Sequence, residues 1–268
     1  MFAKIYDSNN KKFSLNITIK CSGEKTLGVI AEDNGKPNSE YANRQVTING
    51  SRTIYLSFPV SPKQLRIKVW NCKDANDNDF TVELEKKELK SYDIWLDEDT
   101  RDFLTLCVTF SQVCGFEMAS QKGRRFTTED KKFNIKFFDV IYDIKSGRKL
   151  TTPARIGHNS GVIEVAKYKF DNYTIPMRMI ILLHEFSHKY KNPKLGLDIS
   201  NETGADVNAL YVYLGLGFSK IDAICVFANV FLVAQTKGNI ERMRKIMDYI
   251  QKFESGQFAK PNLVPEYV

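Results

Sequence analysis

Histidine is scarce in this chain, and cysteine pairs are absent. The 268 residues include three histidines and five cysteines, and the cysteines form no CxxC motif. An odd number of scattered cysteines fits poorly with a disulfide-bonded secreted scaffold, so we expect a reducing compartment. Zinc binding by cysteine is not indicated.

We expect no signal peptide, and the sequence has no long apolar run. The first ten residues contain no apolar stretch after a basic start, and the longest apolar run, residues 224–234, is too short to span a bilayer. The net charge of +7 is spread widely over 39 basic and 32 acidic residues, which does not indicate specific nucleic-acid binding. We therefore expect a soluble, cytoplasmic protein with no membrane insertion.

Strand-like segments fill the first third of the chain. Apolar and polar residues alternate in six short segments: 14–20, 26–31, 44–48, 52–58, 64–70 and 80–84. Turn residues separate them, notably at Asn34-Gly35, Asn49-Gly50 and Ser61-Pro62. Regularly spaced short strands of this kind predict a β-sandwich over residues 1–90, a module that usually serves attachment or interaction.

From about residue 91 the pattern becomes mainly helical. We expect helices over residues 98–114, over a segment that includes 177–188, and from 202 onward, and two more over 219–234 and 239–256. Strands are expected over 133–142 and 162–170. The sequence therefore predicts an α+β protein in which residues 91–268 form a second domain.

A metal-binding pattern lies in the second of these helices. His184 and His188 enclose Glu185 in an HExxH motif that follows the apolar run 179–183. Residues four apart share one helix face, so both imidazoles can bind one zinc ion, and Glu185 lies where it can act as general base. The alternative is a pair of hydrogen-bonded core histidines. A buried apolar helix, however, rarely carries two imidazoles and a carboxylate without partners for them.

Two acidic residues follow at the expected start of the next helix. Glu202 is the candidate third ligand, and Asp206, one turn later, can accept the second ring N–H of His184. Asn192, Pro193 and Gly196 indicate a turn between the helices, and Ser200 is a candidate N-cap. The alternative for Glu202 is an ordinary first-turn glutamate that the helix dipole favours.

The HExxH plus NExxxD arrangement resembles the gluzincins, the zinc metallopeptidases that include the thermolysin-like enzymes. The resemblance covers about residues 175–210 and implies a zincin-like domain with one Zn²⁺ per chain. It carries over His184, His188 and Glu202 as ligands, Glu185 as the catalytic base and Asp206 as the residue that orients a ligand. The loop between the two helices is shorter than in the thermolysin-like enzymes, which leaves the subfamily and the substrate open.

Gluzincins also present a cationic or phenolic group to the oxyanion of the reaction intermediate. His158 is the candidate here, in a glycine-flanked polar loop before the strand expected at 162–170, the kind of strand that lines the rim of a zincin cleft. Tyr211, Tyr213 and Arg155 are the alternatives, and a packing or surface role stays open for all four.

Two functions remain compatible with these patterns. The first is a metallopeptidase that acts on a protein or peptide substrate, with the sandwich as an attachment module. The second follows from residues 50–70, which loosely resemble segments of virion proteins of crAss-like tailed phages. That resemblance implies a structural ring or collar subunit, located in the virion and contacting neighbouring subunits as a homo-oligomer, with a vestigial or stabilising metal site.

Overall fold

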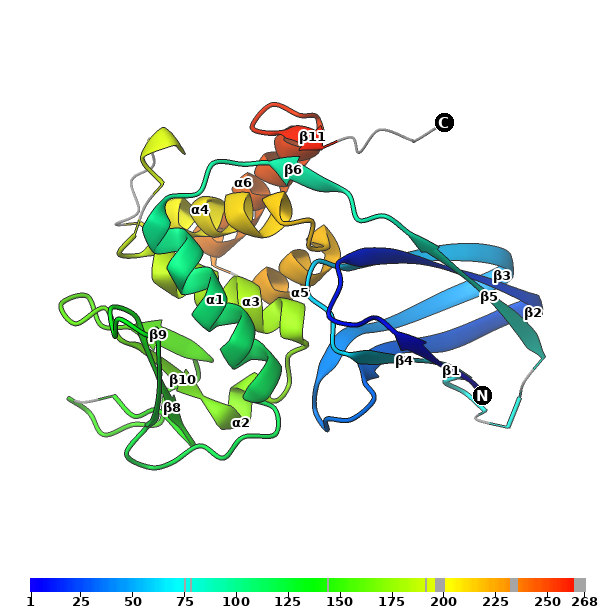
Figure 1. Cartoon of the computed structure of the whole chain (residues 1–268), viewed down its shortest axis with the longest axis horizontal. Coiled ribbons are helices and arrows are strands. Elements are labelled where there is room, and N and C mark those ends of the chain that lie inside the picture. Colours follow the sequence, from blue (N-terminus) through cyan, green and yellow to red (C-terminus); the bar gives the residue numbers. More distant parts are fainter. Residues whose placement is uncertain are drawn as a thin grey trace. The chain divides into compact units, whose positions relative to one another are not determined.

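The chain forms two compact units, Met1–Lys90 and Ser91–Val268, in the computed structural model. The structure describes residues 1–74, 76–77, 79–143, 145–190, 192–195, 201–231 and 236–262. Over these residues the protein is mixed α and β, with largely antiparallel sheets and six α-helices (Figure 1). The division between the units falls where we expected the change from strands to helices.

The first unit is a five-stranded antiparallel sheet. Its strands are β1 (Phe2–Asp7), β2 (Phe13–Asp33), β3 (Glu40–Phe58), β4 (Gln64–Asn71) and β5 (Phe80–Lys87). Four of them lie in the order β1-β4-β2-β3, and β5 also pairs with β2. All five are hydrogen-bonded into one sheet, whereas we expected a sandwich of two.

Strands β2 and β3 are long because each joins two of the expected segments. The predicted turn at Asn49-Gly50 is therefore wrong, since β3 continues through it. The register shifts between Cys21 and Glu24, and Gly23 and Gly50 lie there with φ of 76° and 81°. Such a bulge bends a hairpin without ending it. Before the bulge β2 pairs with β5, and after it β2 pairs with β4.

The two halves of β2 supply the apolar core of the first unit. No helix occurs among its described residues, so the bent sheet has to fold over its own apolar face. The side chains with 0% exposure on β2 and β4 are Leu15, Ile17, Ile19, Leu27, Val29, Ala31, Leu65, Ile67 and Val69. Each fully buried Leu, Ile or Val contributes about 1.5–3 kcal/mol relative to an exposed one.

The second unit contains a four-stranded sheet in the order β7-β8-β10-β9. Its strands are β7 (Arg124–Thr127), β8 (Asn134–Phe138), β9 (Ala154–Ile156) and β10 (Ile163–Ala166). The strand expected over 162–170 stops at Ala166, because the next four residues form the short helix α2 (Lys167–Phe170). β10 is central, parallel to β8 and antiparallel to β9, so β9 is an edge strand of this sheet.

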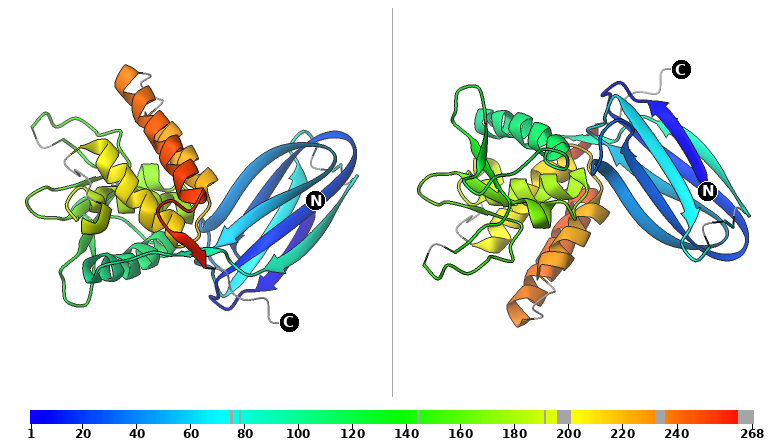
Figure 2. Two further views of the ribbon diagram at one scale, coloured as in Figure 1. Left: turned by 90° about the horizontal axis from the view of Figure 1, so that it is seen from above. Right: turned by 90° about the horizontal axis from the view of Figure 1, so that it is seen from below.

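Five longer helices complete the second unit. They are α1 (Glu98–Val113), α3 (Ile175–Ser187), α4 (Glu202–Gly215), α5 (Lys220–Phe231) and α6 (Lys237–Glu254), with a 3-10 turn at Pro193–Leu195. Two short strands, β6 (Ser91–Asp93) and β11 (Lys260–Asn262), pair with each other. These helices confirm the predicted ones over the described residues, and the expected end of the helix over 219–234 lies outside them. Helix α6 extends beyond its neighbours in both views of Figure 2. Within the described part of the chain, every helix is too short or too polar to cross a membrane.

Candidate metal centre

Helix α3 places both histidines of the HExxH motif on one face. Pro176 lies in its first turn, where a missing N–H costs nothing, and the middle of the helix is buried. The helix ends at Ser187, but His188 keeps helical angles (φ −65°, ψ −18°), so the four-residue spacing still brings the rings together. The two Nε2 atoms are 3.1 Å apart and the ring centroids 4.7 Å apart.

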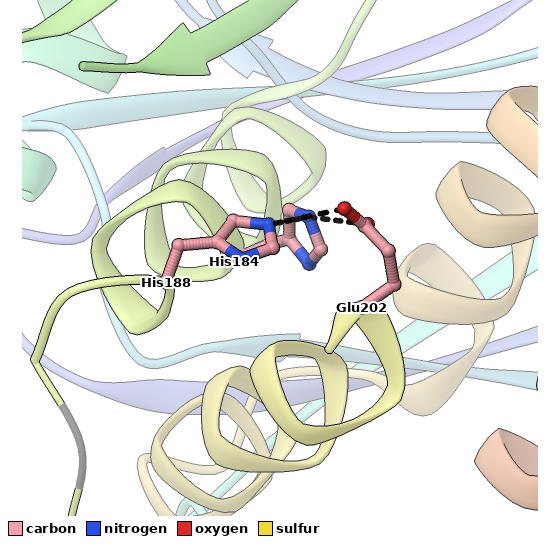
Figure 3. A group of neighbouring side chains, drawn as sticks. All are labelled: His184, His188 and Glu202. Carbon is pink, nitrogen blue, oxygen red and sulfur yellow. Dashed lines mark hydrogen bonds and ion pairs between the residues drawn. The ribbon is translucent and has the colours of Figure 1, made fainter. Parts of the chain in front are cut away.

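Helix α4 brings Glu202 to the same point. The Asn201 side chain caps this helix by accepting the Gly204 N–H at 2.7 Å, and the expected cap, Ser200, lies outside the described residues. The Glu202 oxygens lie 3.5 Å from His184 Nε2 and 3.6 Å from His188 Nε2. Figure 3 shows the three side chains directed toward one another. One ligand atom from each lies within 4.8 Å of the others, so the cluster can hold one metal ion.

Hydrogen bonds at the C-terminal end of α3 fix the two helices to each other. The side-chain amide of Asn208 on α4 makes both bonds. Its Nδ2 donates to Ser187 Oγ at 2.8 Å, and its Oδ1 accepts the Asn192 backbone N–H at 2.9 Å. All three residues are buried. Because Ser187 lies inside the motif and Asn208 lies on the helix of Glu202, these bonds hold the third ligand beside the two histidines.

Asp206 occupies the position expected of a ligand-orienting residue. Its Oδ1 lies 2.8 Å from His184 Nδ1, and its side chain is completely buried. At this distance the Asp206 carboxylate forms an ion pair with the ring when the imidazole is protonated. With Nδ1 turned toward Asp206, Nε2 is the ring nitrogen that faces the cluster.

Arg242 of α6 binds both carboxylates. Its Nη2 donates to Asp206 Oδ1 at 2.7 Å, its Nε contacts Asp206 Oδ2, and its Nη1 lies 2.9 Å from Glu202 Oε2. The Arg242 side chain is 12% exposed. A bidentate guanidinium fixes the plane of the Asp206 carboxylate, and it also restrains Glu202.

The charges in this cluster shift the pKa values of two candidate ligands. Burial alone would lower the pKa of His184, but Asp206 and Glu202 outweigh it and raise this pKa to about 10. The hydrogen bond from His184, with the charges of His184, Arg242 and His188, lowers the pKa of Glu202 to about 2. The carboxylate is therefore ionised at neutral pH, as a metal ligand must be.

Glu185 lies beside the cluster, next to the edge strand. Burial is the main cause that raises the pKa of its carboxyl group, and the charge of Glu202 acts in the same direction. His184 and a hydrogen bond from the Ile156 backbone N–H oppose the shift. A carboxylate with a raised pKa is a better proton acceptor at neutral pH than an exposed one.

A cavity of about 460 Å³ opens onto these side chains. Its walls come from β9 and the residues around it, α3, α4, α5 and α6: Thr152, Pro153, Ala154, Arg155, Ile156, His158, Ile180, Ile181, His184, Glu185, His188, Glu202, Val226, Phe227 and Arg242. The candidates His158 and Arg155 both line it, and the Arg155 guanidinium pairs with Glu164 at 2.7 Å. Tyr211 and Tyr213 are buried and outside its lining, so we reject them as contacts of a ligand in this cavity.

The rim strand of the cavity is β9 rather than the segment 162–170. Sequence reasoning missed β9 because its three residues follow Pro153 and show no alternation.

Comparisons of the chain with protein-family models, with curated proteins and with solved structures find no match. The arguments about function therefore rest on the geometry of the site.

Proposed function

We propose that the second unit is a zinc-dependent metallopeptidase domain of the gluzincin type. The observation that carries this proposal is the spacing of the three candidate ligand atoms. Ligands about 2.0–2.2 Å from zinc in a tetrahedral site lie roughly 3.4 Å from one another. The Nε2 atoms of His184 and His188 are 3.1 Å apart, and they lie 3.5 and 3.6 Å from the two different oxygens of the Glu202 carboxylate, which is close to this value.

The number and type of ligands favour catalysis over a purely structural metal. Structural zinc sites have four protein ligands, usually with cysteine, whereas catalytic sites have three and leave a position for water or substrate. Two histidines and one glutamate form such an open set here. The cavity gives a substrate access to it. Zinc bound there would polarise the scissile carbonyl group and lower the pKa of water to near neutrality.

The remaining groups have roles that follow from their positions. Glu185 takes a proton from the attacking water and transfers it to the nitrogen of the leaving amine. The Ile156 N–H holds the Glu185 carboxylate against β9. An extended peptide can add to the open edge of this strand through backbone hydrogen bonds, which brings its carbonyl group into the cavity.

Two other residues act on the substrate or on the ligands. His158, at the mouth of the cavity, is the side chain that donates to the developing oxyanion. Arg242 and Asp206 hold Glu202 and His184 in their positions.

The test is to compare wild type with Glu185→Gln and Glu241→Gln in zinc analysis and peptide cleavage. Glu241 is an exposed glutamate of α6 outside the cavity lining, so its variant makes the same chemical change away from the site. We expect one zinc per chain in all three proteins. Cleavage of a mixed peptide library should fall by about 10²–10⁴-fold only in Glu185→Gln.

Two results would reject the proposal in different ways. An absence of zinc in wild type would reject the metal site. Stoichiometric zinc without cleavage of any peptide in the library would reject the peptidase, and it would favour the structural ring or collar subunit with a stabilising metal.

A further inference from the structure

All three histidines of this chain line the same cavity. His184 and His188 belong to the motif on α3, whereas His158 comes from the turn after β9. Its ring centroid lies 6.5 Å from that of His188, and its side chain is exposed. An imidazole this close to a candidate metal ligand is itself a potential ligand.

The distances set how far His158 would have to move. Two imidazoles on one tetrahedral zinc have ring centroids roughly 5 Å apart. His184 and His188 already meet this condition at 4.7 Å. His158 is roughly 1.5 Å too far from His188, a shift that rotation of an exposed side chain supplies without unfolding the loop.

The loop that carries His158 is fixed next to the second ligand. Its backbone closes on itself, because the Gly157 N–H donates to Val162 O at 3.0 Å and the Gly161 N–H donates to Gly157 O at 2.7 Å. Lys189, the residue after His188, donates from Nζ to Asn159 O at 3.2 Å. The backbone of the loop is therefore held in place, while the imidazole can turn.

Gly161 makes this attachment possible. Its φ is 68°, and a Cβ at this position would lie 2.9 Å from Lys189 Nζ. A larger residue would push Lys189 away from the loop. The positive φ therefore favours glycine at this point of the loop.

We propose that the His158 imidazole is the fourth metal ligand when no substrate is present, and that the substrate carbonyl group and the attacking water take its place. This inference rests on the proposed function. It gives one side chain two positions: bound to the metal in the resting protein, and beside the oxyanion after displacement. The open coordination position is then protected by the chain itself.

The test uses the full chain loaded with cobalt(II) in place of zinc, as wild type, His158→Ala and Asn159→Ala. Asn159 is an exposed neighbour in the same turn, and its substitution keeps the carbonyl oxygen that Lys189 binds. X-ray absorption should count three imidazoles in wild type and Asn159→Ala, and two in His158→Ala. The visible cobalt bands should change only in His158→Ala, and its affinity for cobalt should fall roughly tenfold or more. Circular dichroism checks that all three proteins are folded.

The outcomes separate this inference from the function on which it rests. Two imidazoles in wild type, with the same cobalt bands in His158→Ala, would overturn the inference even if His158→Ala lost peptide cleavage. In that case the imidazole would act on the substrate alone. If wild type bound no cobalt and no zinc, both the inference and the proposed metal site would be rejected.

Discussion

Replacing Arg242 by methionine tests the electrostatic support of the candidate metal centre. The substitution keeps an unbranched side chain but removes the guanidinium that pairs with Asp206 and Glu202. Asp206 is completely buried, so among its described side-chain contacts it would keep only His184. An uncompensated buried carboxylate is costly, and we expect the metal-free second unit to lose stability.

The size of the loss follows from the burial of the pair. Breaking a buried ion pair by removing one partner costs about 3–5 kcal/mol. Arg242 is 12% exposed and His184 still faces Asp206, so the lower end applies, about 3 kcal/mol. For a unit of this size the melting temperature should fall by roughly 6–12 °C. Arg242→Lys should lose less, because it keeps the charge but not the two parallel hydrogen bonds.

The measurement needs a signal from the second unit alone. The chain has two tryptophans, Trp70 in the first unit and Trp95 in the second, so a Trp70→Phe background leaves Trp95 as the only reporter. Trp95 lies near the site, since its carbonyl oxygen accepts from Asn192 Nδ2 at 3.3 Å. Thermal unfolding is followed by the fluorescence of Trp95. A chelator is present so that the second unit is metal-free.

Arg244→Met is the matched control. Arg244 is exposed on the same helix and makes no ion pair within the described part of the chain, so its loss should change stability by no more than about 0.5 kcal/mol. If Arg242→Met and Arg244→Met melted within about 2 °C of each other, the buried pair would not stabilise the site as we argue.

Two further predictions concern the first unit. Gly28→Ala would place a Cβ against the Trp70 indole ring, so it should destabilise the unit by about 1–3 kcal/mol. The loss is measured by urea unfolding followed by Trp70 fluorescence. Gly35→Ala is the control because space is available there, and an equal loss of stability in that variant would contradict the steric explanation. The hydrogen bond from Lys25 is the main cause that lowers the pKa of Asp77 to about 2, so its carboxylate stabilises the fold above about pH 4 and loses this effect as the pH falls toward 2. Asp77→Asn should therefore be less stable than wild type at pH 7, and a difference that stayed constant down to pH 2 would refute the assignment.

The parts of the candidate site that are local in the sequence could be predicted. His184 and His188 lie one helical turn apart, so their convergence follows from helix geometry alone. Glu202 and Asp206 begin the next helix, and the short connection limits where they can lie. The distance and direction of each contact still required the structure.

Arg242 could not be predicted because it approaches the site through tertiary packing. It comes 36 positions after Asp206, on a helix whose charged sequence offers several equivalent cations.

The long strands β2 and β3 were missed for a different reason. Gly23 and Gly50 are typical turn residues, and only the hydrogen-bond register shows that they make a bulge inside a hairpin.

The bent β2–β3 hairpin also sets the order in which the first unit can assemble. Its pairs begin beside the turn at Asn34-Gly35 and continue, neighbour by neighbour, as far as Phe13 and Phe58. Such contacts form by propagation and need no long loop to close first. β5 instead has to return to the beginning of β2 across two intervening strands, which is a slow, entropically costly closure. The local contacts of the hairpin therefore favour its early formation, whereas β5 and β1 each join the sheet through a closure of more than 50 residues.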